Sequence, residues 1–300
     1  MKKKIMAGLL AVFMILFSFA MAEEGQEVRF KKLTADRNAA EIDLGKVTVS
    51  ESEYKDFKDF LSQFTQLKRV DMFSTKISPK RVTELAEQFP QIEFGWTMNI
   101  KGHLVRTDDV SFSTAHSDSS ARHSETDFSL LKYCKNLLAL DIGHNAVKDL
   151  SFLYDLPQLK ILIIVDNQFQ DLTPVASLHD LEYLEIFYND VRDISCLTTL
   201  TKLKDLNIGW NRIADISPLE SMTWLDRLWI PQYNSHNPMN KPDASAVEKL
   251  RMALPDTQID STAKSSIGNG WRKHPRYDIM RKIFKEKVWI PLEGSESVTP

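Results

Sequence analysis

The chain has 300 residues and a formal net charge of −3 at pH 7, and 43% of its residues are hydrophobic. This mildly acidic balance excludes nucleic acid as the expected partner, because a nucleic-acid-binding surface needs a basic face. The length would accommodate two ordinary domains, but the repeats described below predict one continuous core and hence a single domain.

Residues 1–22 have the composition of an export signal. Three lysines follow Met1, an apolar run covers residues 5–19, and residues 20–22 form a small-x-small cleavage site. The apolar run is shorter than the roughly 20 residues that a membrane span needs, which makes an uncleaved anchor the less favoured alternative. We expect cleavage after Ala22, no stable membrane anchor, and a secreted bacterial protein in the extracellular space or the periplasm.

Residues 23–95 alternate short apolar pairs with helical patterns. Apolar spacing predicts one helix between Ser50 and Phe64 and a second from Ser78 to Phe89. Three apolar pairs match strand positions of the repeats that follow, namely Ile42/Leu44, Val70/Met72 and Ile92/Phe94. We therefore interpret residues 23–95 as irregular helical repeats that cap the N-terminal end of a solenoid.

Residues 96–130 interrupt this pattern. Two short strand patterns flank Lys101-Gly102 and predict a hairpin. A polar run rich in serine and histidine then extends from Ser111 to Thr126. Because insertions in solenoids often lie on the binding face, this insert is interpreted either as part of a binding surface or as a flexible surface linker.

Residues 131–234 repeat one pattern at a spacing of 22 residues. A leucine begins each repeat, at Leu137, Leu159, Leu181, Leu203 and Leu225. An asparagine column follows the strand positions, at Asn145, Asn167, Asn189 and Asn211. A repeat of this length and pattern is a leucine-rich repeat. The sequence therefore predicts an α/β solenoid with a curved parallel sheet on its concave face, a helical and irregular convex side, and helical caps at both ends.

Residues 235–300 are expected to cap the C-terminal end of the solenoid. A loop is followed by a predicted helix from Asp243 to Ala253 and a strand around Gln258-Ile259. An amphipathic helix is predicted from Pro275 to Lys285. We interpret the first helix and the strand as a last rung and the second helix as the C-terminal cap.

The best-formed repeat carries a resemblance to a known family. Residues 203–219 read Leu-x-x-Leu-x-Ile-x-x-Asn-x-Ile-x-Asp-Ile-Ser-Pro-Leu, which closely resembles the internalin-type bacterial leucine-rich repeat. The resemblance implies a concave face that binds other proteins, commonly on host or neighbouring cells, and it implies no catalysis.

Two polar columns have structural explanations. The asparagine amide can bond the backbone of the tight turn that leaves the strand. An aspartate column precedes Ser or Thr on the convex side, where a carboxylate caps backbone amides. Its members are Asp149, Asp171, Asp193 and Asp215. Calcium binding by these stacked carboxylates is the alternative, and we favour capping, with no metal and no cofactor.

The outward strand positions carry aromatic and charged side chains that the scaffold does not require. Adjacent strands lie about 4.8 Å apart, so these side chains would form one stripe. Exposed aromatics rimmed by charge mark interaction surfaces, which predicts that an extracellular protein or peptide binds here. The alternative is that the insert or the C-terminal segment folds over this face and buries it. The predicted partner-binding residues are Asp141, Asp166, Tyr183, Glu185, Phe187, Tyr188, Asp205, Trp210, Arg227 and Trp229.

Three further functions are alternatives to protein binding. Stacked aromatics beside carboxylates also suit a glycan, which makes carbohydrate binding the first alternative. The insert could hold a hydrolase triad of Ser113, His116 and Asp118, although nothing there resembles a nucleophile elbow. A metal site could use His103, His116, His123 and His144, although no zinc-type ligand spacing accompanies them. We therefore predict a binding protein and not an enzyme.

Overall fold

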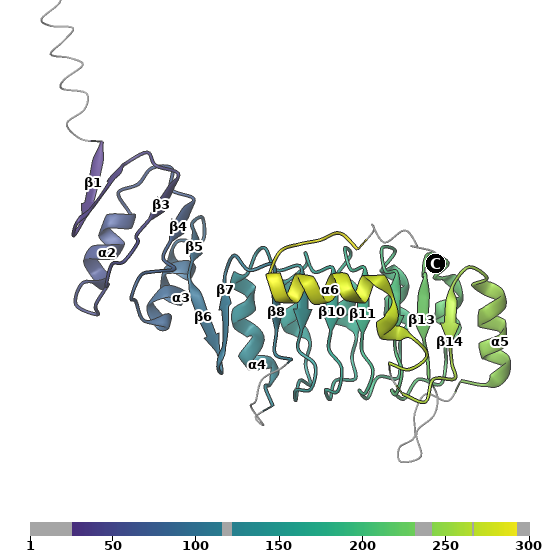
Figure 1. Ribbon diagram of the computed structural model, residues 1–300. Helices are drawn as coiled ribbons and strands as arrows, with labels where there is room; N and C mark the ends of the chain where they lie inside the picture. Colours follow the sequence, from purple (N-terminus) through teal and green to yellow (C-terminus); the bar gives the residue numbers. More distant parts are fainter. Residues whose placement is uncertain (1–25, 116–121, 232–241, 266, 293–300) are drawn as a thin grey trace, which may run out of the picture. The chain divides into compact units, whose positions relative to one another are not determined.

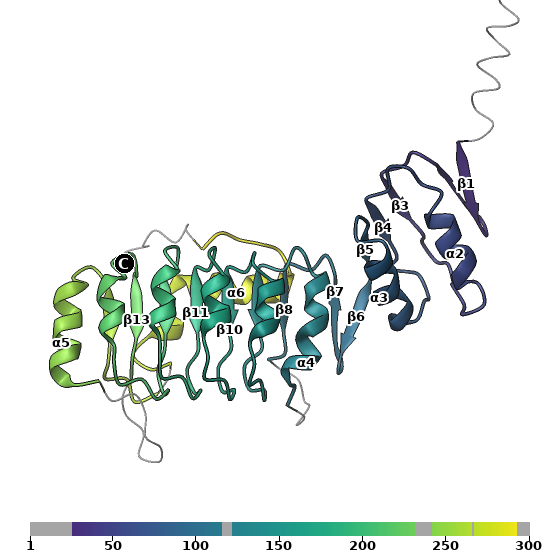
Figure 2. The same cartoon turned by 180° about the vertical axis from the view of Figure 1, so that it is seen from behind.

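The computed structural model describes residues 26–115, 122–231, 242–265 and 267–292, so the predicted export signal lies outside the described residues. The chain divides into two compact units, the first ending at residue 97 and the second starting at residue 98, whereas the sequence predicts a single domain. Figures 1 and 2 show the helices and strands of each unit.

Unit 1 contains a β-hairpin, a three-stranded parallel sheet and two helices. One face of α2 is buried, and its Phe57 and Phe60 rings lie 5.1 and 5.7 Å from the ring of Phe30. The two helices predicted for this region are confirmed. The elements are β1 (Glu27–Phe30), β2 (Leu33–Asp36), β3 (Glu41–Asp43), α2 (Tyr54–Leu61), β4 (Arg69–Asp71), α3 (Pro79–Gln88) and β5 (Glu93–Gly95).

The register of unit 1 corrects one predicted pair. The strands align Ile42 with Val70 and Val70 with Phe94, which are 28 and 24 residues apart. The pairing of Ile92 with the first strand position is therefore wrong, and Phe94 occupies that position instead. Ile92 lies before the strand, where its amide donates to the Phe89 carbonyl at the end of α3.

Unit 2 contains a seven-stranded parallel sheet whose strands lie side by side in chain order. From β9 to β13, partner residues in the register are 22 residues apart, as in the row Ala139, Ile161, Tyr183, Asp205 and Arg227. The strands are β8 (Ser111–Ser113), β9 (Ala139–Asp141), β10 (Ile161–Ile163), β11 (Tyr183–Glu185), β12 (Asp205–Asn207), β13 (Arg227–Trp229) and β14 (Gln258–Asp260).

The predicted insert contributes a strand to this sheet. Strands β6 (Thr97–Ile100) and β7 (His103–Arg106) pair with each other, which confirms the hairpin. The start of the polar run is not a loop, because β8 pairs with β9 and places Phe112 beside Leu140. Phe112 is buried like the leucines of its column. One apolar residue between two serines was too short a signal to predict this strand.

The side of the sheet opposite to the C-terminal helix carries short 3-10 helices in a row (Figure 2). Each follows an aspartate or loop position and buries apolar residues against the core. The helices are α4 (Glu125–Phe128), η1 (Ser129–Tyr133), η2 (Ser151–Asp155), η3 (Thr173–Ser177), η4 (Ser195–Thr199) and η5 (Ser217–Ser221). The core between them and the strands is made of the repeat leucines and isoleucines, which are fully buried.

The C-terminal residues form two separate structures. Helix α5 (Ala244–Ala253) packs on η5 and leads into β14, so the predicted last rung is confirmed. Helix α6 (Pro275–Glu286) follows η6 (Trp271–Lys273) and crosses the sheet towards β8, where the Ser111 hydroxyl donates to the Ile283 carbonyl at 2.9 Å (Figure 1). Helix α6 therefore covers the sheet. The prediction that this helix caps the C-terminal end of the solenoid is wrong.

We call residues 267–292 the C-terminal cover. We use concave face for the side of the sheet of unit 2 that carries the first and third residues of each strand. The C-terminal cover packs on this face through Trp271, Met280, Ile283 and Leu292, all of which are buried. Within the described ranges, no helix is long and apolar enough to cross a membrane.

Candidate binding face

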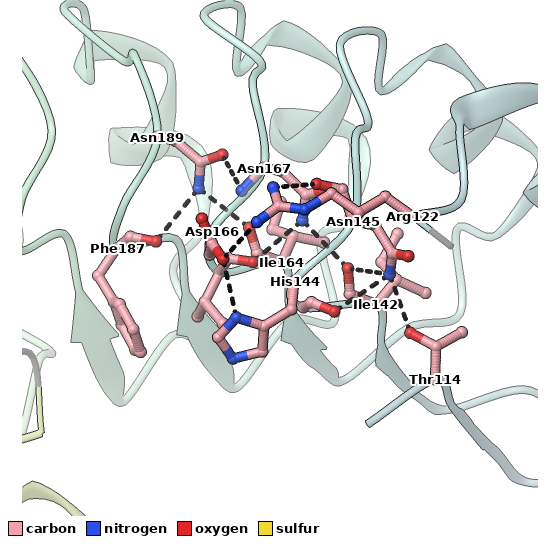
Figure 3. Close-up of polar contacts among 12 residues, drawn as sticks. Thr114, Arg122, Ile142, His144, Asn145, Ile164, Asp166, Asn167, Phe187 and Asn189 are labelled. Carbon is pink, nitrogen blue, oxygen red and sulfur yellow. Dashed lines mark hydrogen bonds and ion pairs between the residues drawn. The ribbon is translucent and has the colours of Figure 1, made fainter. Parts of the chain in front are cut away.

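The asparagine column fixes the turn at which each strand ends (Figure 3). The Asn145 amide donates to the carbonyls of Ile142 and Gly143 at 3.0 and 3.1 Å, and its side-chain oxygen accepts from the His123 amide at 2.9 Å. Asn167 repeats the arrangement on the next rung, where it accepts from the Val147 amide at 3.0 Å. The predicted role of this column is confirmed.

The aspartate column caps the convex turns. Asp149 and Asp171 each accept a hydrogen bond at 2.8 Å from the backbone amide two residues later, and Asp193 and Asp215 do the same at 2.8 and 2.9 Å. The hydroxyl and the amide of Thr173 hold the pKa of the Asp171 carboxyl below its usual range. Capping is therefore confirmed as the function of these carboxylates.

Directly after the strands, four residues adopt left-handed backbone conformations. Their φ angles are +61° at His144, +49° at Asp166, +58° at Tyr188 and +48° at Trp210. Such a conformation costs a non-glycine residue on the order of 1–3 kcal/mol and persists where the surroundings impose it. Here the amides of His144, Asp166 and Tyr188 bond the next rung, as His144 does to Val165 at 2.8 Å. The asparagine side chains bond carbonyls of the same turns. We call these four residues the left-handed row.

The first half of the left-handed row is polar and accessible. The His144 Nδ1 atom lies 2.9 Å from Asp166 Oδ2, and Arg122 Nη2 lies 3.3 Å from the same oxygen (Figure 3). Arg122 also donates to the Asn145 carbonyl at 3.2 Å. The side chains of His144, Arg122 and Asp166 are 67%, 49% and 35% exposed. The three therefore form a solvent-facing charged cluster at the edge of the concave face.

The second half of the left-handed row is aromatic. The Tyr188 ring is 38% exposed and lies 4.5 Å from the ring of Trp210, which is buried. Trp210 packs with Val165 and Phe187, and Ile267 of the C-terminal cover contacts this group. Of the predicted aromatic residues, Tyr188 is thus the one that remains accessible.

The other predicted residues lie beneath the C-terminal cover. Their relative exposures are 0% for Tyr183, 1% for Glu185, 0% for Asp205, 3% for Arg227 and 1% for Trp229. The expectation that these side chains are exposed is wrong, because the cover fills the face above them. The alternative of an internal cover describes this part of the stripe, and the covering element is the C-terminal segment.

Trp271 is the centre of the covered region. Its indole N–H donates to Glu185 Oε1 at 2.8 Å, and its ring lies 5.6 Å from the ring of Tyr183 and 5.0 Å from that of Trp229. The Arg227 guanidinium lies 4.2 Å from the Trp271 ring centre. Burial raises the pKa of the Glu185 carboxyl, while hydrogen bonds from Tyr183 and Trp271 oppose the rise.

A buried charge cluster lies beside Trp271. Asp205 is fully buried between two guanidinium groups, with Arg227 Nε at 2.6 Å and Arg276 Nη1 at 3.1 Å. Arg276 also pairs with Asp226. An isolated buried charge is strongly destabilising, so Asp205 is retained in the core by these two partners.

Asp141 and Ser113 lie at the start of the concave face, and Asp141 is partly buried. Burial raises the pKa of the Asp141 carboxyl, and its oxygens accept from the Gly143 amide at 3.1 Å and the Ser113 hydroxyl at 3.4 Å. Ser113 is thus bonded to Asp141. His116 and Asp118, the other members of the candidate triad, lie outside the described residues, so the triad stays a hypothesis.

The described histidines of the candidate metal site lie in different environments. The His103 and His123 rings are 5.2 Å apart, and His123 is buried. His144 instead pairs with Asp166. Among the residues that the structure describes, no group of three or more histidine, cysteine or acidic side chains could hold a metal ion.

Sequence reasoning missed three residues of this region. Arg122, Trp271 and Arg276 lie 44, 86 and 71 residues from the acidic partners that they bind. None of them belongs to a column of the repeat. The place of His144 in the binding face could be predicted from the sequence, because His144 occupies the same repeat position as Asp166 and Tyr188.

The parallel strands, the asparagine column and the row of 3-10 turns define an α/β leucine-rich-repeat solenoid. The family model described as "Leucine Rich repeat" matches residues 199–216. The chain therefore has the leucine-rich-repeat fold. Proteins of this class are typically interaction modules without catalytic activity, and they generally bind proteins or peptides.

Solved structures of proteins from two bacteria are similar to this chain. An internalin of Listeria monocytogenes is 20% identical over 67% of this chain and 65% of its own, with a TM-score of 0.36. A second internalin of that bacterium is 23% identical over 53% of this chain and 76% of its own, with a TM-score of 0.33. A leucine-rich-repeat protein of Leptospira interrogans is 19% identical over 67% and 50%, with a TM-score of 0.38.

This chain thus spans 65% of the length of the first internalin and half that of the Leptospira protein. At these identities and scores, the similarities carry no argument about function. Among curated proteins, none matches the sequence.

Proposed function

We propose that this chain is a secreted bacterial leucine-rich-repeat protein, with internalin-type repeats, that binds an extracellular protein or peptide on its concave face. The export-signal pattern of residues 1–22 supports secretion, and the repeat at residues 203–219 supports the internalin type. The fold class supports binding over catalysis.

The observation that carries this proposal is the left-handed row. Four non-glycine residues on neighbouring rungs hold a conformation that costs free energy, and two of them are aromatic. The asparagine column alone would permit smaller residues at these positions. Tyr188 and Asp166 are accessible at the edge of the concave face, with Arg122 and His144 beside them. An accessible tyrosine next to a charged cluster is the composition of a protein-binding hot spot.

The ten predicted residues take three roles in this proposal. Asp166 and Tyr188 contact the partner directly from the edge. Asp141, Phe187 and Trp210 support that edge from beneath. The remaining five lie under the C-terminal cover and contact a partner where the cover is displaced: Tyr183, Glu185, Asp205, Arg227 and Trp229.

The test uses peptides selected against the full chain from a displayed random library. Tyr188→Asn removes the ring while keeping a residue that tolerates the left-handed conformation. We expect the selected peptides to bind this variant at least tenfold more weakly than the wild type, since a hot-spot tyrosine contributes about 2 kcal/mol. Tyr154→Asn is the matched control, because Tyr154 is also exposed, at 53%, but lies on the convex side.

Equal binding of the selected peptides to the wild type and the Tyr188→Asn variant would contradict the proposal. Asp166→Asn tests the polar half of the same edge, and we expect a smaller loss from it because Asp166 already pairs with Arg122 and His144. Loss of binding in the Tyr154→Asn variant instead would move the site to the convex side.

A glycan is the second candidate ligand. The accessible Tyr188 ring and the Asp166 carboxylate lie on adjacent rungs, and sugars bind through an aromatic platform beside hydrogen-bonding groups. The buried state of Trp210 leaves a single accessible ring for stacking, which favours a protein or peptide. A glycan array without hits would remove this candidate.

A further inference from the structure

The C-terminal cover and the concave face have complementary charges. Residues 267–292 contain seven lysines or arginines and two acidic residues, although the whole chain has a net charge of −3. The face below presents buried or half-buried carboxylates, among them Asp205 and Glu185. Asp109, in the loop between β7 and β8, pairs with Lys287 of the cover at 2.5 Å. The concave face of unit 2 is therefore an acidic receptor surface that is filled by a basic segment.

The seat of Trp271 recognises an indole specifically. Tyr183 and Trp229 form two of its walls, and the Arg227 guanidinium lies over the ring. The Glu185 carboxylate accepts the indole N–H at 2.8 Å. A phenylalanine would fill much of the same space but would leave Glu185 Oε1 with the Tyr183 hydroxyl as its remaining donor, and losing one of two hydrogen bonds is costly in a buried site.

Arg276 provides a second recognition point five residues later. It lies in the first turn of α6 and pairs with Asp205 and Asp226. The face thus recognises a tryptophan that is followed five residues later by an arginine. Two such anchors set the register and the direction of a bound helical segment.

The attachment of the cover differs from that of the strands. Its backbone hydrogen bonds, such as Trp271 to Gly268 and Lys287 to Ile283, lie within the segment. Side chains join it to the described strands, as in the pairs Ser111–Ile283 and Trp229–Gly268. Strands β9 to β13 are instead each bonded to two neighbouring strands through their backbones. The cover can therefore leave without breaking the ladder of the sheet.

The fit between cover and face is also incomplete. Among the described residues, the buried atoms Glu185 Oε2 and Arg227 Nη2 have no hydrogen-bond partner. Unsatisfied buried polar atoms are costly, so a ligand that supplies one more donor and one more acceptor would bind this face more tightly than the cover does.

We propose that the concave face of unit 2 is a receptor for a basic, helical peptide carrying tryptophan and, five residues later, arginine, and that the C-terminal cover occupies it as a displaceable internal ligand. This proposal rests on the proposed function and names the class of partner for its concave face. The cover competes with the external partner, and the accessible edge at Tyr188 lies outside the contested region.

The experiment weakens the cover in the full chain and restores the ligand as a separate peptide. Arg276→Glu places a carboxylate against Asp205 and Asp226, and it replaces a residue of the cover and none of the solenoid. Arg281→Glu is the matched control, because it makes the same charge change on an exposed position of α6. The probe is a labelled synthetic peptide with the sequence of residues 267–292.

We expect the peptide to bind the Arg276→Glu variant at least tenfold more tightly than the wild type or the Arg281→Glu variant. The same peptide with the substitution Trp271→Ala should bind the Arg276→Glu variant at least tenfold more weakly than the unchanged peptide does. Equal binding of the peptide to all three proteins, or no effect of the tryptophan, would overturn the proposal.

Hydrogen exchange of the wild-type chain provides a second test that does not depend on a variant. We expect the α6 amides to exchange together and faster than those of β10 to β12, because the cover opens while the sheet stays closed. Exchange of α6 only at the rate of those strands would also overturn the proposal. Either failure leaves the Tyr188 test of the proposed function unaffected, so the two can be distinguished.

Discussion

The two units carry charge triads of opposite composition and opposite burial. In unit 1, Arg69 pairs with Asp71 and Glu93, and the three side chains are 22%, 37% and 42% exposed. In unit 2, Asp205 pairs with Arg227 and Arg276, and the exposures are 0%, 4% and 15%. The first triad lies on outward positions of the sheet of unit 1, whereas in the second triad Asp205 and Arg227 lie on the sheet of unit 2 and Arg276 lies on α6. The difference arises because the C-terminal cover supplies Arg276 and shields the second triad from water.

This comparison shows that the strand pattern alone does not decide what an outward residue does. An exposed ion pair contributes about 0–1 kcal/mol. A buried one is costly to break, because its loss leaves an uncompensated charge in the core. The predictions below test this difference, beginning with the largest expected effect.

Asp205→Ala should destabilise the chain by about 5 kcal/mol, because it leaves the Arg227 and Arg276 guanidiniums without their shared carboxylate. Chemical denaturation of the wild type and the variant measures this loss. Arg69→Ala, at the centre of the exposed triad, should cost less than about 1 kcal/mol. Similar losses from the two substitutions would remove the distinction between the triads.

Trp271→Ala should cost about 4 kcal/mol, the range for removing a large buried aromatic side chain. The same denaturation experiment on Trp289→Ala provides the control, since Trp289 belongs to the cover but is only partly buried. A loss at Trp271 no greater than that at Trp289 would show that Trp271 is not the anchor of the cover.

Asn167→Ala should cost about 2 kcal/mol, because it removes the amide bonds to the Ile142 and Val165 carbonyls and leaves the buried Val147 amide without an acceptor. Asn38→Ala in unit 1 is the control, since Asn38 is exposed and accepts one hydroxyl. Thermal unfolding that is unchanged in the Asn167→Ala variant would contradict the structural role of the asparagine column.

The smallest effect concerns pH. Burial raises the pKa of Glu185 above its ordinary value of 4.5. A carboxyl whose folded pKa is raised contributes stability below its unfolded pKa and loses that contribution as the pH rises through the folded value. The stability of the wild type relative to Glu185→Gln should therefore fall as the pH increases from 4.5. Denaturation of both proteins across this range measures the difference, and a constant difference would contradict the raised pKa.

Asp171 gives the opposite dependence. Its pKa is lowered by the hydroxyl and the amide of Thr173. Its contribution is present above its ordinary value of 3.8 and lost as the pH falls below that value. The stability contributions of Glu185, a covered carboxyl, and Asp171, a capping carboxylate, thus change with pH in opposite directions.

Periodic features of this molecule could be predicted from the sequence. The leucine, asparagine and aspartate columns each repeat one local interaction on successive rungs, so a single rung specifies the others. The helices of unit 1 and the last rung at β14 were also predictable, because capping residues and apolar spacing mark them locally.

The covered site could not be predicted because its contacts are not periodic. Trp271 reaches Glu185 across 86 residues, and no column of the repeat includes it. The aromatic stripe indicated that something binds the concave face, but it did not specify that Tyr183 and Trp229 bind a segment of the same chain. Likewise, Phe112 alone did not reveal that β8 extends the sheet.

The central claim is that the concave face of unit 2 is filled by the C-terminal cover while its edge is accessible. Hydroxyl-radical footprinting of the full chain measures side-chain accessibility and tests this most directly. We predict rapid modification of Tyr188 and of the exposed Tyr154, and protection of Tyr183, Trp229 and Trp271. Modification of Tyr183 and Trp229 at the rate of Tyr188 would contradict the claim.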